Sequence, residues 1–140
     1  MKTLLICSIL ACPYTLAGVP KSYVPNDAER ARWTMSDLRS LATAVEAYAV
    51  DNTTYPAAAT LTALLPMIEP TYIRKAPAVD AWGNAYVYVP SADRRSYRLI
   101  SGGSDGRTDP KSWEIAGALA TFEEDAVVDS GSFSRSWPYR

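Results

Sequence analysis

The feature that most constrains this chain is a long amphipathic stretch that begins at Asn26. Apolar residues recur there at steps of three and four, which places them on one face of a helix, while most charged residues fall outside that face. The letters Asn-Asp-Ala-Glu at residues 26–29 are typical of a capping box, in which Asn26 accepts from an early helix amide and Glu29 reaches back. We therefore predict a helix of about seven turns from Asp27 to near Asn52.

Short apolar runs in the second half of the chain predict strands. The candidate strands are Ala85–Val89, Ser96–Ser101, Ala126–Val128 and Ser132–Trp137. A polar loop joins the first two and is typical of an antiparallel hairpin. Short helical turns are expected at residues 60–65, closed by Pro66, and at residues 113–119. The sequence predicts an α+β fold, with one long amphipathic helix packed on a three- to four-stranded antiparallel sheet.

The first residues are typical of a secretory signal peptide. Lys2 precedes the apolar run Leu4–Ala11, which is too short to cross a membrane of about 30 Å. We expect cleavage after Ala17, which makes residues 18–140 the globular domain of a periplasmic or secreted protein. A lipoprotein site at Cys12 is the alternative. No later stretch is long and apolar enough to predict a transmembrane span in the mature chain.

Composition excludes several classes of function. The chain has no histidine, which removes Ser–His–Asp triads, Cys–His pairs and histidine-bound zinc. Its formal net charge is −1, without the basic stripe that a nucleic-acid surface needs. Residues 102–106 match the letters G-x-S-x-G, but Ser104 has no histidine to activate it, so we interpret the motif as a glycine turn.

Carboxylates cluster in two places that neighbouring strands would bring together. Asp105 and Asp109 follow the second predicted strand, and Glu123–Asp125 precede the third. Converging oxygen donors beside glycines suit Ca²⁺, which takes about six to eight oxygens. Two alternatives remain open: a solvated acidic rim, and an enzyme with a carboxylate pair at Asp105 and Asp125.

The segment Val79–Tyr86 is the most distinctive in the chain. Asp80 suits a turn in which its side chain accepts from its own backbone, and Gly83 permits a sharp reversal. Trp82 supplies a large apolar side chain that can be buried under the turn. We predict that this turn anchors the sheet to the helix, with ligand stacking on Trp82 as the alternative.

Several segments, in the same order along the chain, resemble the head domain of the major pseudopilins of type II secretion systems, the general secretion pathway protein G family. Residues 80–88 (DAWGNAYVY) are similar to the family's D-P-W-G-x-P-Y-x-Y, and residues 97–106 resemble its second strand and S-x-G-x-D-G loop. Residues 39–56 resemble its helix exit, and residues 121–138 resemble its closing acidic motif and final strand.

This resemblance implies a non-enzymatic structural subunit or accessory that acts in protein secretion. The implied partners are other pseudopilins or secretion-machinery proteins, including further copies of the chain, and no nucleic acid. Heads of this family bind Ca²⁺ in loops around the closing strands. Carried over by position, the implied ligands are Asp105, Glu123, Glu124 and Asp125.

The start of the chain departs from the family. Pseudopilins begin with a prepilin leader and a continuous apolar helix embedded in the membrane, whereas prolines at positions 13 and 20 interrupt this chain. We therefore expect a pseudopilin head exported as a soluble protein. The alternative is a soluble, exported, Ca²⁺-dependent interaction module that shares the fold.

Overall fold

A computed structural model describes residues 23–138 of the chain. The predicted signal peptide, residues 1–17, and the alternative lipoprotein site at Cys12 lie outside this range. Within residues 23–138, no helix combines the length and the apolar character needed to cross a membrane.

Helix α1 spans Asp27–Asn52 and confirms the predicted long helix. Its capping box is formed: the Glu29 amide donates to Asn26 Oδ1 (2.9 Å), and the Asn26 amide donates to Glu29 Oε2 (3.0 Å). The helix ends at Thr53, whose φ of 63° lies in the left-handed region. Both ends therefore lie where the sequence pattern predicts them.

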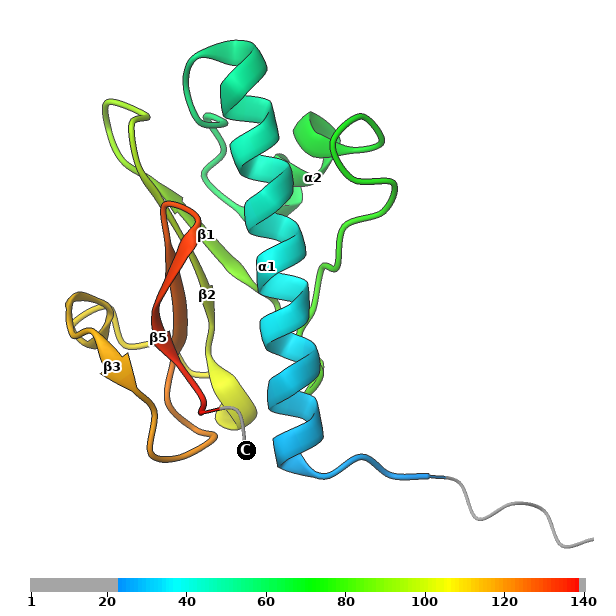
Figure 1. Cartoon of the computed structure of the whole chain (residues 1–140), viewed down its shortest axis with the longest axis vertical. Coiled ribbons are helices and arrows are strands. Elements are labelled where there is room, and N and C mark those ends of the chain that lie inside the picture. Colours follow the sequence, from blue (N-terminus) through cyan, green and yellow to red (C-terminus); the bar gives the residue numbers. More distant parts are fainter. Residues whose placement is uncertain (1–22, 139–140) are drawn as a thin grey trace, which may run out of the picture.

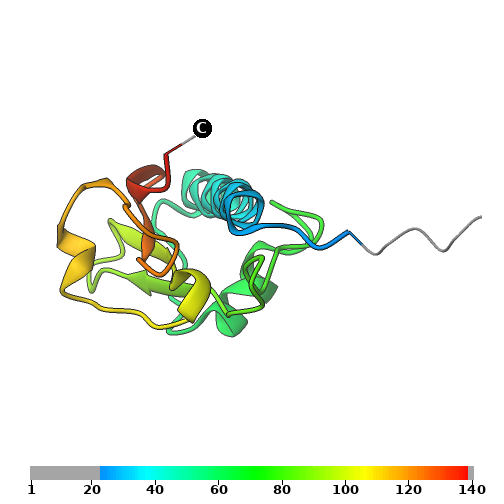
Figure 2. The ribbon, with the colours of Figure 1, turned by 90° about the horizontal axis from the view of Figure 1, so that it is seen from below.

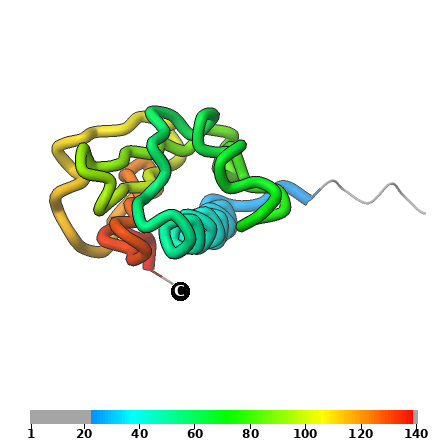
Figure 3. Tube along the Cα trace, turned by 90° about the horizontal axis from the view of Figure 1, so that it is seen from above, coloured from blue at the N-terminus to red at the C-terminus, as the bar shows by residue number. Residues whose placement is uncertain are grey.

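One face of α1 packs against the sheet (Figure 1). Its buried residues are Ala31, Thr34, Met35, Leu38, Leu41, Ala42, Ala44 and Val45. The alanines leave room for large sheet residues, and the Tyr97 hydroxyl comes close enough to donate to the Ala42 carbonyl (3.4 Å). Viewed along α1, the strands gather to one side of the helix and the segment that carries α2 (Leu61–Ile68) to another (Figures 2 and 3).

The sheet has five strands in the spatial order β1-β2-β4-β5-β3. Their bounds are Val87–Pro90 (β1), Tyr97–Ser101 (β2), Gly117–Ala118 (β3), Ala126–Asp129 (β4) and Ser132–Ser136 (β5). Strands β1, β2, β4 and β5 pair antiparallel, and β3 runs parallel to β5 at the edge. A long helix on a mostly antiparallel sheet confirms the predicted α+β class.

The predicted helical turn at residues 113–119 is wrong. A short 3-10 turn covers Ser112–Glu114, and the chain then extends into β3, which raises the strand number to five. The backbone at Gly117 has φ of 148°, far from helical values, and the Leu119 amide donates to the Ser136 carbonyl (3.0 Å). Pairing with a distant strand therefore replaces local helical bonds.

The predicted helix end at Pro66 is also wrong, because α2 continues through this proline to Ile68. Proline removes one helical amide, and the carbonyl that loses its partner belongs to the exposed residue Thr62, where water can replace it. The buried residues Leu61 and Ile68 hold the two ends of this short helix against the core, and Leu64 holds its middle.

The turn at residues 80–84 ties α1 to the sheet, as predicted. Asp80 Oδ1 accepts from the Trp82 amide (3.0 Å), and Asp80 Oδ2 accepts from the Ser101 hydroxyl on β2 (2.8 Å). The Trp82 ring nitrogen donates to Asp27 Oδ1 in the first turn of α1 (2.9 Å). One turn thus bonds to both layers of the fold.

Candidate functional site

The candidate site lies where the loop after β2 meets the segment before β4. These strands are neighbours with Ser101 opposite Ala126, so the two acidic segments converge at one end of the sheet as expected. The Ser104 amide donates to the Phe122 carbonyl (2.7 Å). A side chain at Gly103, which has φ of 66°, would collide with that carbonyl, so glycine permits the contact.

The two segments enclose an open pocket of about 290 Å³. Its lining residues are Asp105, Arg107, Thr108, Asp109, Ser112, Glu123, Glu124, Asp125 and Arg135. The structure therefore brings all four predicted ligands around one pocket. It adds two arginines, whose positive charge opposes that of a bound cation.

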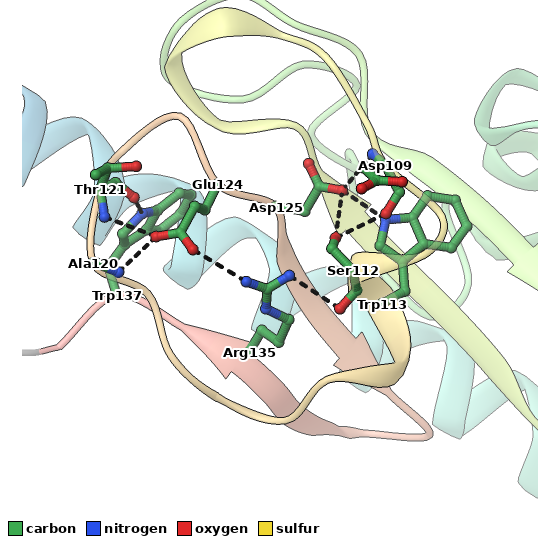
Figure 4. A network of polar contacts seen from close by, with 9 residues as sticks. All are labelled: Asp109, Ser112, Trp113, Ala120, Thr121, Glu124, Asp125, Arg135 and Trp137. Carbon is green, nitrogen blue, oxygen red and sulfur yellow. Dashed lines mark hydrogen bonds and ion pairs between the residues drawn. The ribbon is translucent and has the colours of Figure 1, made fainter.

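Both carboxylate oxygens of Glu124 are engaged by the protein. Oε2 accepts from the Ala120 amide (2.6 Å) and the Thr121 amide (2.8 Å), and Oε1 pairs with Arg135 Nη2 (3.3 Å). Hydrogen bonds from the Thr121 and Ala120 amides and the charge of Arg135 lower the pKa of Glu124, although partial burial opposes them. Glu124 is thus held as a carboxylate by two amides of its own loop and by Arg135 on β5 (Figure 4).

Asp125 is 4% exposed and anchors the segment that follows β2. Its Oδ2 accepts from the Asp109 amide (2.8 Å), the Ser112 hydroxyl (3.3 Å) and the Trp113 ring nitrogen (2.7 Å). Figure 4 shows its other oxygen pointing away from these donors. Three donors on one oxygen give Asp125 a structural role, which argues against the hypothesis of a catalytic pair with Asp105.

Asp105 and Glu123 are the exposed members of the predicted set. Asp105 ends the 3-10 turn Gly103–Asp105, and its Oδ1 accepts from the Arg107 amide (2.9 Å). Ser104 lies in the same turn, so the G-x-S-x-G letters form a glycine turn rather than a strand-to-helix elbow.

The four predicted carboxylates are not equally free to hold a calcium ion. Among residues 23–138, no three acidic side chains are placed to hold one metal ion. Two amides occupy Glu124 Oε2 and Arg135 lies against Oε1, while three donors occupy Asp125 Oδ2. Calcium binding stays a prediction, with Asp105, Glu123 and Oδ1 of Asp125 as the oxygens still available.

Sequence reasoning missed Arg135, the residue at the centre of this network. Period-two alternation places residue 135 on the same face of its strand as Phe133, towards α1. The register of β4 and β5 shifts, however, so that Phe133 pairs with Val128 and Arg135 with Val127, which leaves Ser134 as an extra residue. The sequence offered one signal of this role: a charged residue between two large aromatic residues, Phe133 and Trp137, in a predicted strand.

Comparison with known proteins gives consistent similarities. The family model described as type II secretion system protein G matches residues 24–115, a range that includes Asp105 and stops before Glu123. The chain is 30% identical over 118 residues to the type II secretion system core protein G of Pseudomonas aeruginosa, with 76% of this chain and 80% of that protein covered. It is 36% identical over 85 residues to the protein of that name from Escherichia coli K12, with 51% of this chain and 57% of that protein covered.

Proposed function

We propose that this chain, which belongs to the protein G family of type II secretion systems, is a non-enzymatic structural subunit or accessory of the secretion machinery. The observation that carries the proposal is the family match over residues 24–115, which takes in α1, the 80–84 turn and the β1–β2 hairpin. These are the elements that hold the helix and the sheet together. The network around the acidic pocket also favours a structural role over a catalytic one.

Cross-linking in the native cells tests this proposal. A photoreactive residue replaces Trp33, which lies on α1 and is 48% exposed, so the substitution leaves the core intact. We expect adducts with type II secretion components or with further copies of the chain, identified by mass spectrometry. The control places the probe at Trp33 in cells that lack the secretion genes, where the adducts with those components should vanish. Adducts with none of these proteins in wild-type cells would refute the proposal.

The family acts at the cell envelope, and we place the chain in the periplasm or outside the cell. The support is the charged start and short apolar run of residues 1–17, which lie outside the described residues. N-terminal sequencing of the protein recovered from its cells tests this placement. A start at Gly18 supports a cleaved signal peptide, and a lipid-bearing Cys12 supports an anchored lipoprotein. An intact Met1 would contradict export.

An independent calcium-dependent interaction module, the alternative function, is not favoured by the family match. Calcium binding itself is a separate prediction for the acidic pocket. Calorimetric titration of the purified protein with CaCl₂ tests it, with Asp105→Asn as the matched variant, because Asp105 is exposed and its loss leaves the core intact. Heat of binding that disappears in the variant would support the site. Equal heats for the two proteins would place any binding elsewhere.

A further inference from the structure

A long segment between β2 and β4 is tied down by charged groups at both of its ends. Near its start, the Asp109 amide and the Trp113 ring nitrogen donate to Asp125 Oδ2 (2.8 and 2.7 Å). Near its end, the Ala120 and Thr121 amides donate to Glu124 (2.6 and 2.8 Å). The two carboxylates, which are consecutive in the chain, thus hold two separate stretches of backbone, and the pairing of β3 with β5 holds the backbone between these stretches.

Arg135 adds a charged side-chain link between the two stretches. Its Nη1 donates to the Ser112 carbonyl (3.0 Å), and its Nη2 pairs with Glu124 Oε1 (3.3 Å) (Figure 4). Arg135 is 9% exposed, and a guanidinium stays charged even when it is buried. A buried charge is tolerated only when it is paired and hydrogen-bonded, and both conditions are met here.

We propose that Arg135 performs in this loop the role that a bound metal ion performs in others. A structural cation joins a carboxylate and a backbone carbonyl from separate segments, and the Arg135 guanidinium joins Glu124 to the Ser112 carbonyl. The segment at residues 112–124 therefore holds its shape without a metal ion. This inference does not depend on the proposed role in secretion.

The surrounding charges agree with an internal cation. The guanidinium already neutralises Glu124, whose second oxygen is taken by two amides. A divalent ion seated on Glu124 would have to displace these donors and lie close to a fixed positive charge. If Asp105 and Oδ1 of Asp125 held a calcium ion, that ion would therefore bind beside a segment whose shape Arg135 already holds.

Hydrogen exchange of the purified full chain, measured in excess EDTA and in excess CaCl₂, tests the proposal. We expect the amides of residues 112–121 to be protected equally in both solutions. Arg135→Met removes the charge while keeping much of the side-chain volume. It should speed exchange of these amides about tenfold or more, because the segment loses the two bonds that the guanidinium makes to the Ser112 carbonyl and to Glu124. Amides of α1 should change little.

Arg107→Met is the matched control, since Arg107 lines the same pocket but is exposed. It should leave the exchange of residues 112–121 unchanged. Glu124→Gln removes the negative partner of the same ion pair and keeps an oxygen that can accept from the Ala120 and Thr121 amides. It replaces Arg135→Met in the test if that variant does not fold. It should speed exchange in the same segment, by less than Arg135→Met does.

Two results would overturn the proposal. One is wild-type protection of residues 112–121 that is lost in EDTA and restored by CaCl₂, which would make a metal ion the element that closes the segment. The other is an Arg135→Met protein, or in its place a Glu124→Gln protein, whose exchange matches that of the Arg107→Met control.

Discussion

Replacing Asp80 by alanine should destabilise the protein more than replacing any exposed aspartate. Asp80 is 4% exposed, and its carboxylate accepts three hydrogen bonds. One comes from Ser101, which is fully buried, and the others come from the half-buried amides of Trp82 and Asn84. Loss of the buried acceptor costs about 2 kcal/mol, and each half-buried amide, which water can reach, about half of that. The expected loss of unfolding free energy is therefore about 4 kcal/mol.

Urea unfolding followed by tryptophan fluorescence measures this loss, with an unchanged denaturant slope as evidence of two-state behaviour. Asp93→Ala is the matched control, because Asp93 accepts from Ser91 (2.6 Å) and the Arg95 amide (3.1 Å) in an exposed hairpin loop. It should cost clearly less than Asp80→Ala, because water can replace the acceptor in an exposed loop. Asp80→Asn keeps an acceptor for the two turn amides, so its loss of unfolding free energy should lie between those of Asp80→Ala and Asp93→Ala. Equal losses for Asp80→Ala and Asp93→Ala would show that the 80–84 turn does not brace the fold.

Three further changes test the helix. Asn26→Ala removes the side-chain half of the capping box and should lower the unfolding free energy in urea by about 1 kcal/mol; no change would mean that the cap is not formed in solution. Leu38→Ala empties a fully buried site between α1 and the sheet and should cost about 2–5 kcal/mol in the same assay, whereas a loss below that range would place Leu38 outside the core. Desolvation raises the pKa of Asp37, against the hydrogen bond from Tyr86, so the charged form is disfavoured in the folded state. Asp37→Asn should therefore melt higher than wild type at pH 7, and the difference should vanish as the pH falls below the ordinary Asp37 pKa of 3.8; an offset that persists at low pH would assign the effect to packing.

The long helix could be predicted because its signals are local. The capping box at Asn26 and the apolar spacing towards Val45 depend only on neighbouring residues, and the structure places the helix as predicted. The convergence of Asp105 with Glu123–Asp125 was also predictable, because short apolar runs flank both segments and become the adjacent strands β2 and β4. The family resemblance, carried by the order of such segments, is confirmed by the match over residues 24–115.

Features that depend on distant pairing could not be predicted. Strand β3 has two residues, Gly117 and Ala118, which is too short to show alternation, and it exists because β5 offers a partner. The register shift beside Ser134 directs Arg135 to the acidic pocket, and no local pattern marks it. For this reason the pocket was predicted as four carboxylates, without the arginine that neutralises one of them.

Release of a type II cargo from cells that lack this chain tests the central claim most directly. The amount of cargo in the medium is compared for wild-type cells, for cells without the gene, and for the latter after the wild-type gene is restored. A subunit or accessory of the secretion machinery predicts that cargo stays inside the cells without the chain and reappears in the medium on restoration. Equal release from all three would contradict a role in secretion.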